Sequence, residues 1–302
     1  MDKLMDPSSK ETRTLYESFP FPSGATPHLV SHWTNLLVDY INEKKLAPRI
    51  KSFLDAGCGT GDIVINFSKT FPKIEFQALD LSSSSIMIAQ AKMQHEKINN
   101  ITFEVKDLLS LDSKEKFDCI TSLGVIHHTA SPQRCLKNLV TALKPKGIIF
   151  IDLYGYYGYH HVDRGQKLVN ILEPDFEKLN CRLEAMNWIV SSFYGIQPPS
   201  DIHHPHYIAL VDGFVNPRAS SYKIIDALKL LKESGLVNVE WWDRPKISNK
   251  NITYLSAKGQ SFDIPIPSQW AHCLRDLSTD EQYRFFELCF TPFDFFLVGQ
   301  KQ

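Results

Sequence analysis

Three glycines that follow an acid are the residues of this sequence best suited to binding a ligand. Gly57, Gly59 and Gly61 come directly after a short apolar run that ends near Asp55. Glycine lets the backbone approach a bound molecule where a Cβ would collide, and it permits a positive φ in a tight turn. Residues 60–71 have the pattern of a helix, and its free N–H groups would face the same ligand. This stretch therefore predicts a site for an anionic or hydroxyl-rich cofactor.

Two further carboxylates stand where neighbouring strands are expected to end. Asp80 comes nineteen positions after the last glycine, where a carboxylate can accept hydrogen bonds from both hydroxyls of a ribose. The other role open to Asp80, capping the next helix, is better filled by Ser82 and the serines after it. Asp107 follows the third predicted strand and is placed to accept from an adenine amino group. Leu81 and Leu108 would then flank the adenine ring.

The spacing of the glycines argues against a dinucleotide. The dinucleotide fingerprint is G-x-G-x-x-G, and here Asp62 stands where the third glycine would fall. A pyrophosphate would meet an acid at that position. Asp55, in contrast, would hold the charged amino-acid end of a ligand or orient the glycine turn. An adenosine that carries an amino acid fits these carboxylates better than a dinucleotide does.

The residues around these groups alternate between strand and helix patterns. Such alternation predicts an α/β fold with a parallel sheet, right-handed crossovers and helices on both faces. Ligands bind to such sheets at the carboxyl ends of the strands. The predicted strands cover residues 52–56, 74–79, 101–105, 117–123 and 147–153, and the predicted helices cover residues 60–71, 83–97 and 132–143.

The second half is expected to complete the sheet after a long interruption. A helix over 222–234 ends at Gly235, a strand over 237–242 should follow, a capping-box pattern opens a helix at Ser278, and residues 295–299 read as a last, antiparallel strand. More than sixty residues precede the first of these helices, which is too many for a loop. We therefore expect an N-terminal helical cap at 1–50, a Rossmann-like cofactor-binding core at 51–154, an insertion or substrate lid at 155–220, and completion of the sheet with a helical insertion at 221–302.

Composition indicates a globular protein with reduced thiols. The chain has 302 residues, 43% of them hydrophobic, and a formal net charge of -1, so it lacks the overall basic field that draws proteins to nucleic acid. Its six cysteines form no CxxC pair, residues 1–6 lack the apolar core of a signal peptide, and no run approaches the roughly 18 apolar residues of a membrane helix. We expect a cytoplasmic protein with no nucleic-acid partner and no integral membrane association.

The sequence resembles a known family in its first half. The stretch 55–61 is similar to the first motif of class I S-adenosylmethionine-dependent methyltransferases, Asp80 to the second-strand acid of that family and Asp107 to its adenine-side acid. The resemblance implies a Rossmann-like seven-stranded class I methyltransferase sheet and S-adenosyl-L-methionine as the cofactor.

Later motifs place the chain near particular branches of that family. Residues 123–128 resemble the fourth-strand motif of the branch related to ubiquinone and menaquinone methyltransferases, which adds Leu123 to the implied cofactor site. Residues 143–147 resemble the usual entry to strand five, with Lys146 where glycine is more common. Residues 16–22 are similar to the Tyr-Glu-x-Phe-Pro-Tyr-Pro opening of a bacterial subgroup. The implied substrate pocket consists of Tyr16, His128, Tyr154, Asp212 and Tyr222.

Catalysis by such an enzyme asks little of its side chains. The sulfonium is already activated, so holding a nucleophile in line with the methyl group supplies much of the acceleration. A base matters only when the nucleophile arrives protonated. His127 and His128 are the candidates, because they follow strand four and an imidazole with a pKa of about 6.5 suits proton transfer at neutral pH. The alternative is that one packs in the core and the other only lines the pocket.

The function expected from these motifs is methyl transfer to an unidentified acceptor, with a small molecule favoured over a protein side chain. One alternative is an aminopropyl-type transferase on the same fold, and another is a catalytically inactive S-adenosylmethionine-binding partner protein. The histidine-rich stretch 201–206 is interpreted as a polar lid loop, because metal ligands usually come from a helix or from distant elements that converge. No metal is expected.

Overall fold

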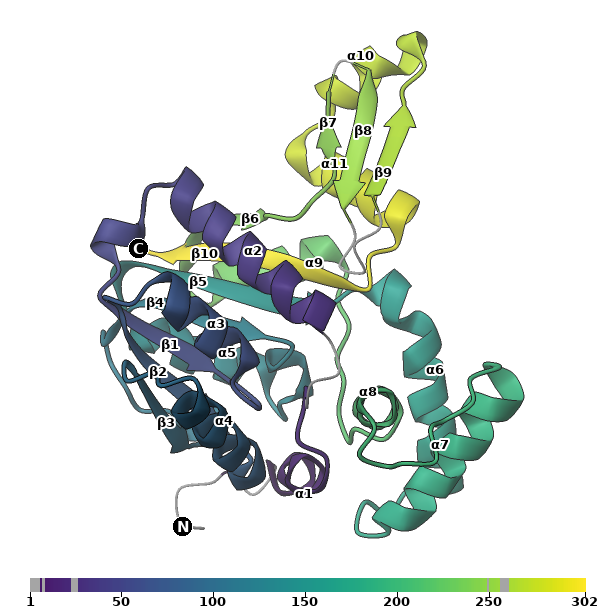
Figure 1. Cartoon of the computed structure of the whole chain (residues 1–302). Helices are drawn as coiled ribbons and strands as arrows, with labels where there is room; N and C mark the ends of the chain where they lie inside the picture. The colour runs from purple at the N-terminus through teal and green to yellow at the C-terminus, as the bar shows by residue number, and fades with distance from the viewer. Residues whose placement is uncertain (1–5, 7–8, 23–26, 249, 256–260) are drawn as a thin grey trace.

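The structure is a computed structural model that describes residues 6, 9–22, 27–248, 250–255 and 261–302. Its centre is one sheet (Figure 1), formed by β1 (Ser52–Ala56), β2 (Glu75–Asp80), β3 (Ile101–Val105), β4 (Phe117–Leu123), β5 (Leu143–Tyr154), β6 (Leu236–Trp241) and β10 (Asp294–Lys301). The strand order is β3-β2-β1-β4-β5-β10-β6. β1 to β5 are parallel, and β10 is antiparallel to β5 and to β6. This confirms the predicted seven-stranded Rossmann-like fold.

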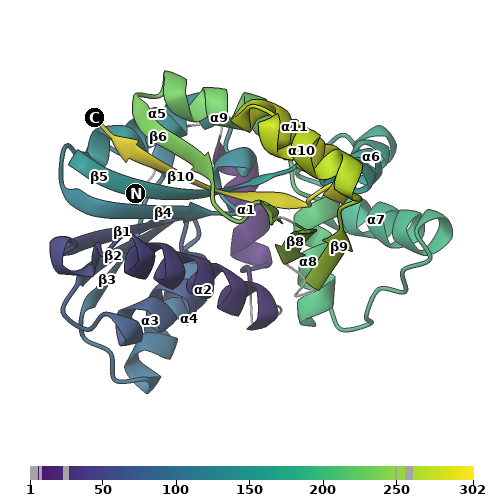
Figure 2. The same ribbon diagram turned by 90° about the horizontal axis from the view of Figure 1, so that it is seen from above.

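Two apolar layers cover the faces of the sheet. On one face lie α2 (Pro27–Glu43), α3 (Asp62–Thr70) and α4 (Ser83–His95), and on the other lie α5 (Pro132–Ala142), α9 (Ile224–Glu233) and α11 (Thr279–Phe290) (Figure 2). Successive strand residues enter opposite layers, so Phe150 packs with Trp33 whereas Ile151 packs with Leu136. Strands that are buried on both faces read as continuous apolar runs, and this is why the sequence predicted them well.

Further helices pack beside the end of β5. They are α6 (Tyr156–Leu172), α7 (Leu179–Phe193) and α8 (Pro205–Phe214), and α1 (Lys10–Ser18) packs against them. One cluster of buried side chains joins Leu15 of α1 to Tyr159, Met186 and Val211 of the three later helices. The N-terminal helix and the long insertion therefore share a small core of their own.

A second sheet was not predicted from the sequence. β7 (Lys246–Ile247), β8 (Asn251–Leu255) and β9 (Ser261–Pro265) form it, and together with α10 (Ser268–Asp276) it projects from the main body (Figure 1). β9 is exposed along its whole length, so its residues show no alternation between a buried and a solvated face. The helical insertion predicted for this region therefore contains these strands in addition to its helices.

Two of the differences between the predicted and the observed element boundaries have a clear local cause. The helix after the glycine turn begins at Asp62 and not at residue 60, because Gly61 still has a φ of 80°. The fifth strand begins at Leu143 and not at residue 147, and the pairing register with β4 shifts within this stretch. Lys146 has a φ of 64° there. A glycine would adopt this backbone conformation without strain, which is consistent with the glycine that the resemblance led us to expect at this position.

Two predicted end signals are confirmed. Ser278 and Glu281 form a capping box at the start of α11, and Gly235 follows α9 with a φ of 96°. In the described part of the chain, no helix is both long and apolar enough to cross a membrane. Residues 1–5, which contributed to the expectation that a signal peptide is absent, lie outside the described residues.

Candidate cofactor and acceptor site

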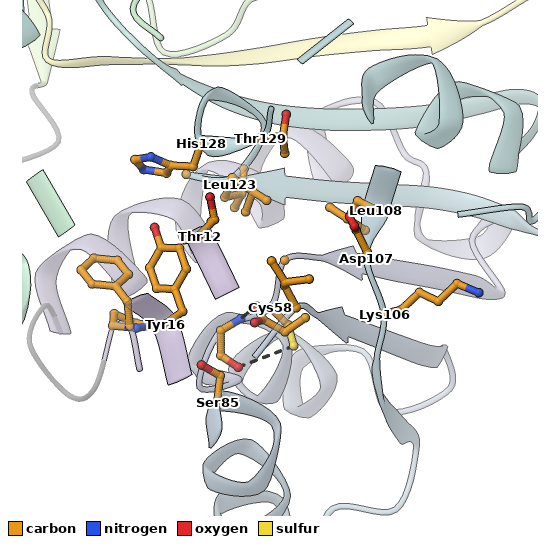
Figure 3. Close-up of a pocket in the computed structure, with 18 of the residues that line it drawn as sticks. Thr12, Tyr16, Cys58, Ser85, Lys106, Asp107, Leu108, Leu123, His128 and Thr129 are labelled. Atoms are coloured by element: carbon orange, nitrogen blue, oxygen red, sulfur yellow. Dashed lines mark hydrogen bonds between the residues drawn. The ribbon is translucent and has the colours of Figure 1, made fainter. Parts of the chain in front are cut away.

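A cavity opens at the carboxyl ends of β1 to β4, where the sequence placed the ligand site. Figure 3 shows Lys106, Asp107 and Leu108 on one side of it and Tyr16, Thr12 and His128 on the other. We call this space the cofactor cavity. Its lining comes from three parts of the chain, namely the N-terminal segment (Ser9, Thr12, Tyr16, Phe21, Pro22, Trp33), the ends of β1 to β3 (Gly57, Cys58, Gly59, Asp62, Ile63, Asp80, Leu81, Ser85, Lys106, Asp107, Leu108) and the end of β4 (Leu123, Gly124, Val125, His128, Thr129, Ala130).

The glycine turn forms the floor of the cavity and depends on its glycines. Gly57, Gly59 and Gly61 have φ values of 85°, 51° and 80°. A Cβ on Gly59 would lie 2.2 Å from the carbonyl oxygen of Phe21, and a Cβ on Gly61 would lie 2.8 Å from the Cβ of Ala89. Gly61 is absent from the cavity lining, so its role is to let α3 and α4 pack closely.

Asp80 combines a fixed position with free hydrogen-bonding capacity. Its Oδ2 accepts from the backbone N–H of Gly59 at 2.8 Å, and its Oδ1 accepts from the N–H of Ser82 at 2.9 Å. A carboxylate has about four acceptor positions, so each oxygen keeps a lone pair for a ligand. Burial raises the pKa of Asp80, and these two hydrogen bonds counteract that rise. This geometry is the one that the ribose role predicted for Asp80 would require.

Asp107 is placed as predicted but already has a backbone partner that the sequence did not reveal. Its Oδ1 accepts from the N–H of Leu109, and its Oδ2 accepts from the N–H of Asp6, each at 2.9 Å. Arg134 donates to the Asp6 carboxylate at 2.7 Å. The N-terminal segment therefore closes over the end of the cavity at which Asp107 lies. Leu108 lines the same end.

Asp55 lies behind the glycine turn and is absent from the cavity lining. Its side chain is buried, and its Oδ1 accepts from the Thr121 hydroxyl at 2.8 Å. Burial raises its pKa to about 7, although the hydrogen bond from Thr121 acts in the opposite direction. Of the two roles expected for Asp55, this position suits orienting the turn and does not suit direct contact with the ligand. Leu81 and Leu123 do line the cavity.

Glu17 holds the N-terminal helix onto the cofactor-binding core. Its two carboxylate oxygens accept from the backbone N–H groups of Ser83 and Ser84, each at 2.9 Å, and from both serine hydroxyls. These groups are the N-terminus of α4, where the helix dipole also favours a negative charge. Burial alone would raise the pKa of Glu17, but the hydrogen bonds outweigh it and lower the pKa to about 2.

We expect this contact to contribute pH-dependent stability. A carboxylate whose folded-state pKa lies below its ordinary 4.5 stabilises the fold fully above that value, and the contribution is lost as pH falls towards 2. Glu17→Ala should lower the free energy of unfolding by about 1 kcal/mol at pH 7, as for other lost helix caps. The difference from wild type should shrink at pH 3 in denaturant titrations. Glu177→Ala, at an exposed ion pair with Lys10, is the matched control. An equal loss at both pH values would contradict the assignment.

Gly59 gives a second prediction with a matched control. Gly59→Ala must place a methyl group 2.2 Å from the Phe21 carbonyl oxygen, whereas Gly195→Ala has nothing within 4 Å at a similar φ of 65°. Both variants carry the cost of a positive φ, about 1–2 kcal/mol, but only Gly59→Ala also displaces the N-terminal segment. We expect Gly59→Ala to lose about 1–3 kcal/mol more in unfolding titrations. Equal losses would show that the Phe21 contact is unimportant.

The two candidate histidines have different surroundings. His127 is fully buried, stacks on Tyr154 with 3.8 Å between ring centroids, and is absent from the cavity lining. Burial lowers its pKa well below the ordinary value, so it is a neutral core residue. His128 lines the cavity, and its Nδ1 lies 2.8 Å from the carbonyl oxygen of Arg218. A carbonyl can only accept, so Nδ1 carries the proton and Nε2 keeps a lone pair.

The remaining predicted pocket residues are brought together, but only Tyr16 joins His128 in the lining. The Tyr16 hydroxyl donates to Asp212 at 2.7 Å and accepts from the Asn216 side chain at 2.9 Å. Tyr154 donates to the other oxygen of Asp212 at 3.4 Å. Tyr222 pairs with the backbone of the β5 end and does not reach the cavity. Asp212 and Tyr154 therefore support the wall from behind.

Several residues of the site were missed by the sequence argument. Thr12 and Trp33 line the cavity from helices that lie far from the glycine turn in sequence, and no spacing rule connects them to it. Glu17 carried a detectable signal, because a run of serines at 82–85 offers a helix N-terminus that favours an acid. As for metals, the described residues contain no group of three side chains that could hold an ion, and this includes the stretch 201–206.

Comparison of the sequence with known proteins points to the same class of enzyme core. Residues 50–194 match the family described as "Methyltransferase domain". A malonyl-[acyl-carrier protein] O-methyltransferase from Bacillus cereus is 34% identical over 34% of this chain and 37% of its own length. An uncharacterized protein from Synechococcus is 29% identical over 57% of this chain and 43% of its own length. The chain thus spans less than half the length of these two relatives.

A solved structure shows the same fold. PKMT2 from Rickettsia typhi superposes with a TM-score of 0.59 at 17% identity, covering 93% of this chain and 53% of that one. The same protein in complex with AdoHcy gives a TM-score of 0.55 at 20% identity, covering 83% of this chain and 49% of that one. Fold, glycine turn and matched domain together define an S-adenosylmethionine-binding methyltransferase core. The match over residues 50–194 and the order of the strands thus support a class I S-adenosylmethionine-dependent methyltransferase fold for this part of the chain.

Proposed function

We propose that this protein transfers a methyl group from S-adenosyl-L-methionine to an acceptor that binds between the N-terminal helix and the end of β4. The observation that carries the proposal is the carboxylate of Asp80, which the N–H groups of Gly59 and Ser82 fix at the cavity wall with lone pairs to spare. A diol is the natural ligand for two such oxygens, and a ribose supplies one.

The cavity fits the rest of the cofactor as well. Leu81 and Leu108 provide apolar surface beside Asp107, which suits an adenine ring. Gly57 and Gly59 line the cavity without side chains of their own, so the backbone of the turn can approach the extended amino-acid end of the ligand closely. The ordering of these groups before binding favours affinity, since little conformational freedom remains to be lost.

When bound, S-adenosylmethionine would supply an activated methyl group on a sulfonium. The residues of this chain would then do the remaining work of holding the acceptor in line and excluding water. α1 covers the cavity through Thr12 and Tyr16, and Trp33 closes it from α2. His128 offers Nε2 as a proton acceptor at the same end. Positioning of this kind accounts for much of the rate enhancement in transfers from activated donors.

Labelled methyl transfer tests the proposal directly. Purified protein would be incubated with a cell extract and S-adenosylmethionine carrying a radiolabelled methyl group, and the extract would be split into protein, lipid, nucleic-acid and small-molecule fractions. We expect label in one fraction, and none with an Asp80→Ala variant. Label in no fraction, together with copurification of a stoichiometric partner enzyme, would point to an inactive binding protein. Turnover only with decarboxylated S-adenosylmethionine would point to an aminopropyl-type transferase.

The proposal also covers the location of the protein, the class of its acceptor and the roles of its segments. We place the protein in the cytoplasm, with an acceptor in the small-molecule or protein fraction and no nucleic-acid partner. The net charge of -1 supports the last of these assignments, because the chain has no overall basic field. We assign residues 51–154 to the cofactor core and residues 155–220, together with the N-terminal cap at 1–50, to the acceptor pocket. The shared core of α1, α6, α7 and α8 supports the second assignment.

A further inference from the structure

Tyr16 and His128 line the end of the cofactor cavity where we place the methyl-accepting substrate. This end offers lone pairs for hydrogen bonds and lies near a negative charge. The Tyr16 hydroxyl donates its hydrogen bond to Asp212 and accepts one from the side-chain N–H of Asn216. A phenol oxygen can accept two hydrogen bonds, so one acceptor position remains on the cavity-lining oxygen. Burial, followed by the charge of Asp212, raises the pKa of Tyr16 well above its ordinary value. The proton therefore stays on the phenol and remains committed to Asp212.

His128 adds a second acceptor beside Tyr16. Its Nδ1 donates to the Arg218 carbonyl, and its buried Nε2 has no hydrogen-bond partner among the described residues. The two rings meet edge to face with 6.4 Å between their centroids. Figure 3 shows the Tyr16 hydroxyl directed to the side of the cavity where His128 lies. Both residues line the same end of the cavity, and each has one acceptor position that no described residue fills and no N–H or O–H left to donate.

No lysine or arginine among the described residues lines the end of the cavity near Tyr16 and His128. Of the described residues that line the cavity, Lys106 alone is a lysine or arginine; it lies beside Asp107 at the opposite side and pairs with Asp112 at 3.6 Å. Arg218 accepts from His128 through its carbonyl oxygen, its Nη2 pairs with Glu11 at 3.0 Å, and it is absent from the cavity lining. A methyl acceptor that arrives as an anion would meet lone pairs in the lining and the field of the Asp212 carboxylate behind it, with no compensating cation among the described lining residues of this end.

We propose that the acceptor is an amine that enters as an ammonium, with Asp212 acting through Tyr16 to attract it and His128 removing its proton. This rests on the proposed methyl transfer and names its substrate class. The ammonium donates one N–H to Tyr16 Oη and another to His128 Nε2. One proton passes to Nε2, the freed nitrogen lone pair forms the N–CH3 bond, and the C–S bond breaks with its electron pair remaining on sulfur. The imidazolium then releases the proton to solvent.

Charge at the methyl position can be tested before the acceptor is known. Sinefungin carries a carbon with an ammonium group in place of the methylated sulfur, and S-adenosylhomocysteine has a neutral sulfur there. By calorimetry we expect wild type to bind sinefungin about tenfold more tightly than S-adenosylhomocysteine, since a charge-assisted hydrogen bond is made only by the former. Tyr16→Phe and Asp212→Asn should each bring that ratio towards one. Tyr194→Phe, which alters a tyrosine bonded to the His161 carbonyl, should leave the ratio unchanged.

The outcomes separate this inference from the function on which it rests. Binding of S-adenosylhomocysteine without a preference for sinefungin would overturn the amine assignment and leave methyl transfer standing. Failure to bind either ligand would overturn both. A second readout uses the labelled product from extract, which should resist alkaline hydrolysis and elute as a cation. Release of the label as methanol in base would identify a methyl ester and refute an amine acceptor.

Discussion

Replacement of Asp80 by alanine is expected to abolish cofactor binding. The variant removes both acceptors for the ribose hydroxyls and also the contact that holds the N–H of Gly59. Each hydrogen bond to a charged group is worth about 1.5–3 kcal/mol, so we expect affinity for S-adenosylhomocysteine to fall at least about a hundredfold. Isothermal titration calorimetry with wild type and variant side by side measures this.

Two controls keep the Asp80 result interpretable. Circular dichroism and thermal unfolding of Asp80→Ala establish whether the sheet is retained. Asp118→Ala removes a carboxylate at the opposite end of the sheet, where it binds Lys144 and the backbone of Ser52, and it should leave cofactor affinity unchanged. A folded Asp80→Ala that binds S-adenosylhomocysteine as tightly as wild type would refute the ribose role.

Replacement of His128 by asparagine is expected to separate catalysis from binding. Asparagine keeps an N–H donor close to the position of Nδ1 and so preserves the contact with the Arg218 carbonyl, but it removes Nε2. Loss of a general base typically costs a factor of about 10²–10⁴ in rate. The initial rate of labelled methyl transfer should fall by that amount, while affinity for S-adenosylhomocysteine stays within about threefold of wild type, since Nε2 makes no cofactor contact in the proposal.

The pH dependence distinguishes a base from a packing residue. If His128 removes a proton from an ammonium, alkaline pH should rescue His128→Asn, because the free amine becomes more abundant and no longer needs the base. His95→Asn, at an exposed position on α4, is the control for a general loss of imidazole. A rate loss in His128→Asn that is the same at every pH would indicate a structural role only.

The sequence predicted correctly those parts of the structure in which a short local pattern has a single physical cause. β1 and β4 are apolar because both faces are buried, and the turn after β1 needs glycine because its φ values are positive. Asp80 was found because it ends a strand beside that turn. Each of these inferences used fewer than thirty consecutive residues.

The parts that sequence could not predict depend on contacts between distant segments. Asp107 receives the N–H of a residue 101 positions away, and Tyr16 reaches Asp212 across 196 positions. Asp55 has the same residue type as Asp80 and also ends a strand, yet it faces Thr121 inside the sheet. The choice between His127 and His128 likewise depends on whether Tyr154 or the cavity lies beside each ring.

The placement of β10 has a practical consequence for anyone who shortens this chain. The recognisable domain ends at residue 194, yet β10 lies between β5 and β6 and pairs with both. A fragment trimmed to residues 50–194 would leave β5 as an open edge, which invites intermolecular pairing. It would also lack Tyr16 and Glu17. We therefore expect that expression of the recognisable domain alone would yield aggregated material, and that recombinant work requires both ends of the sequence.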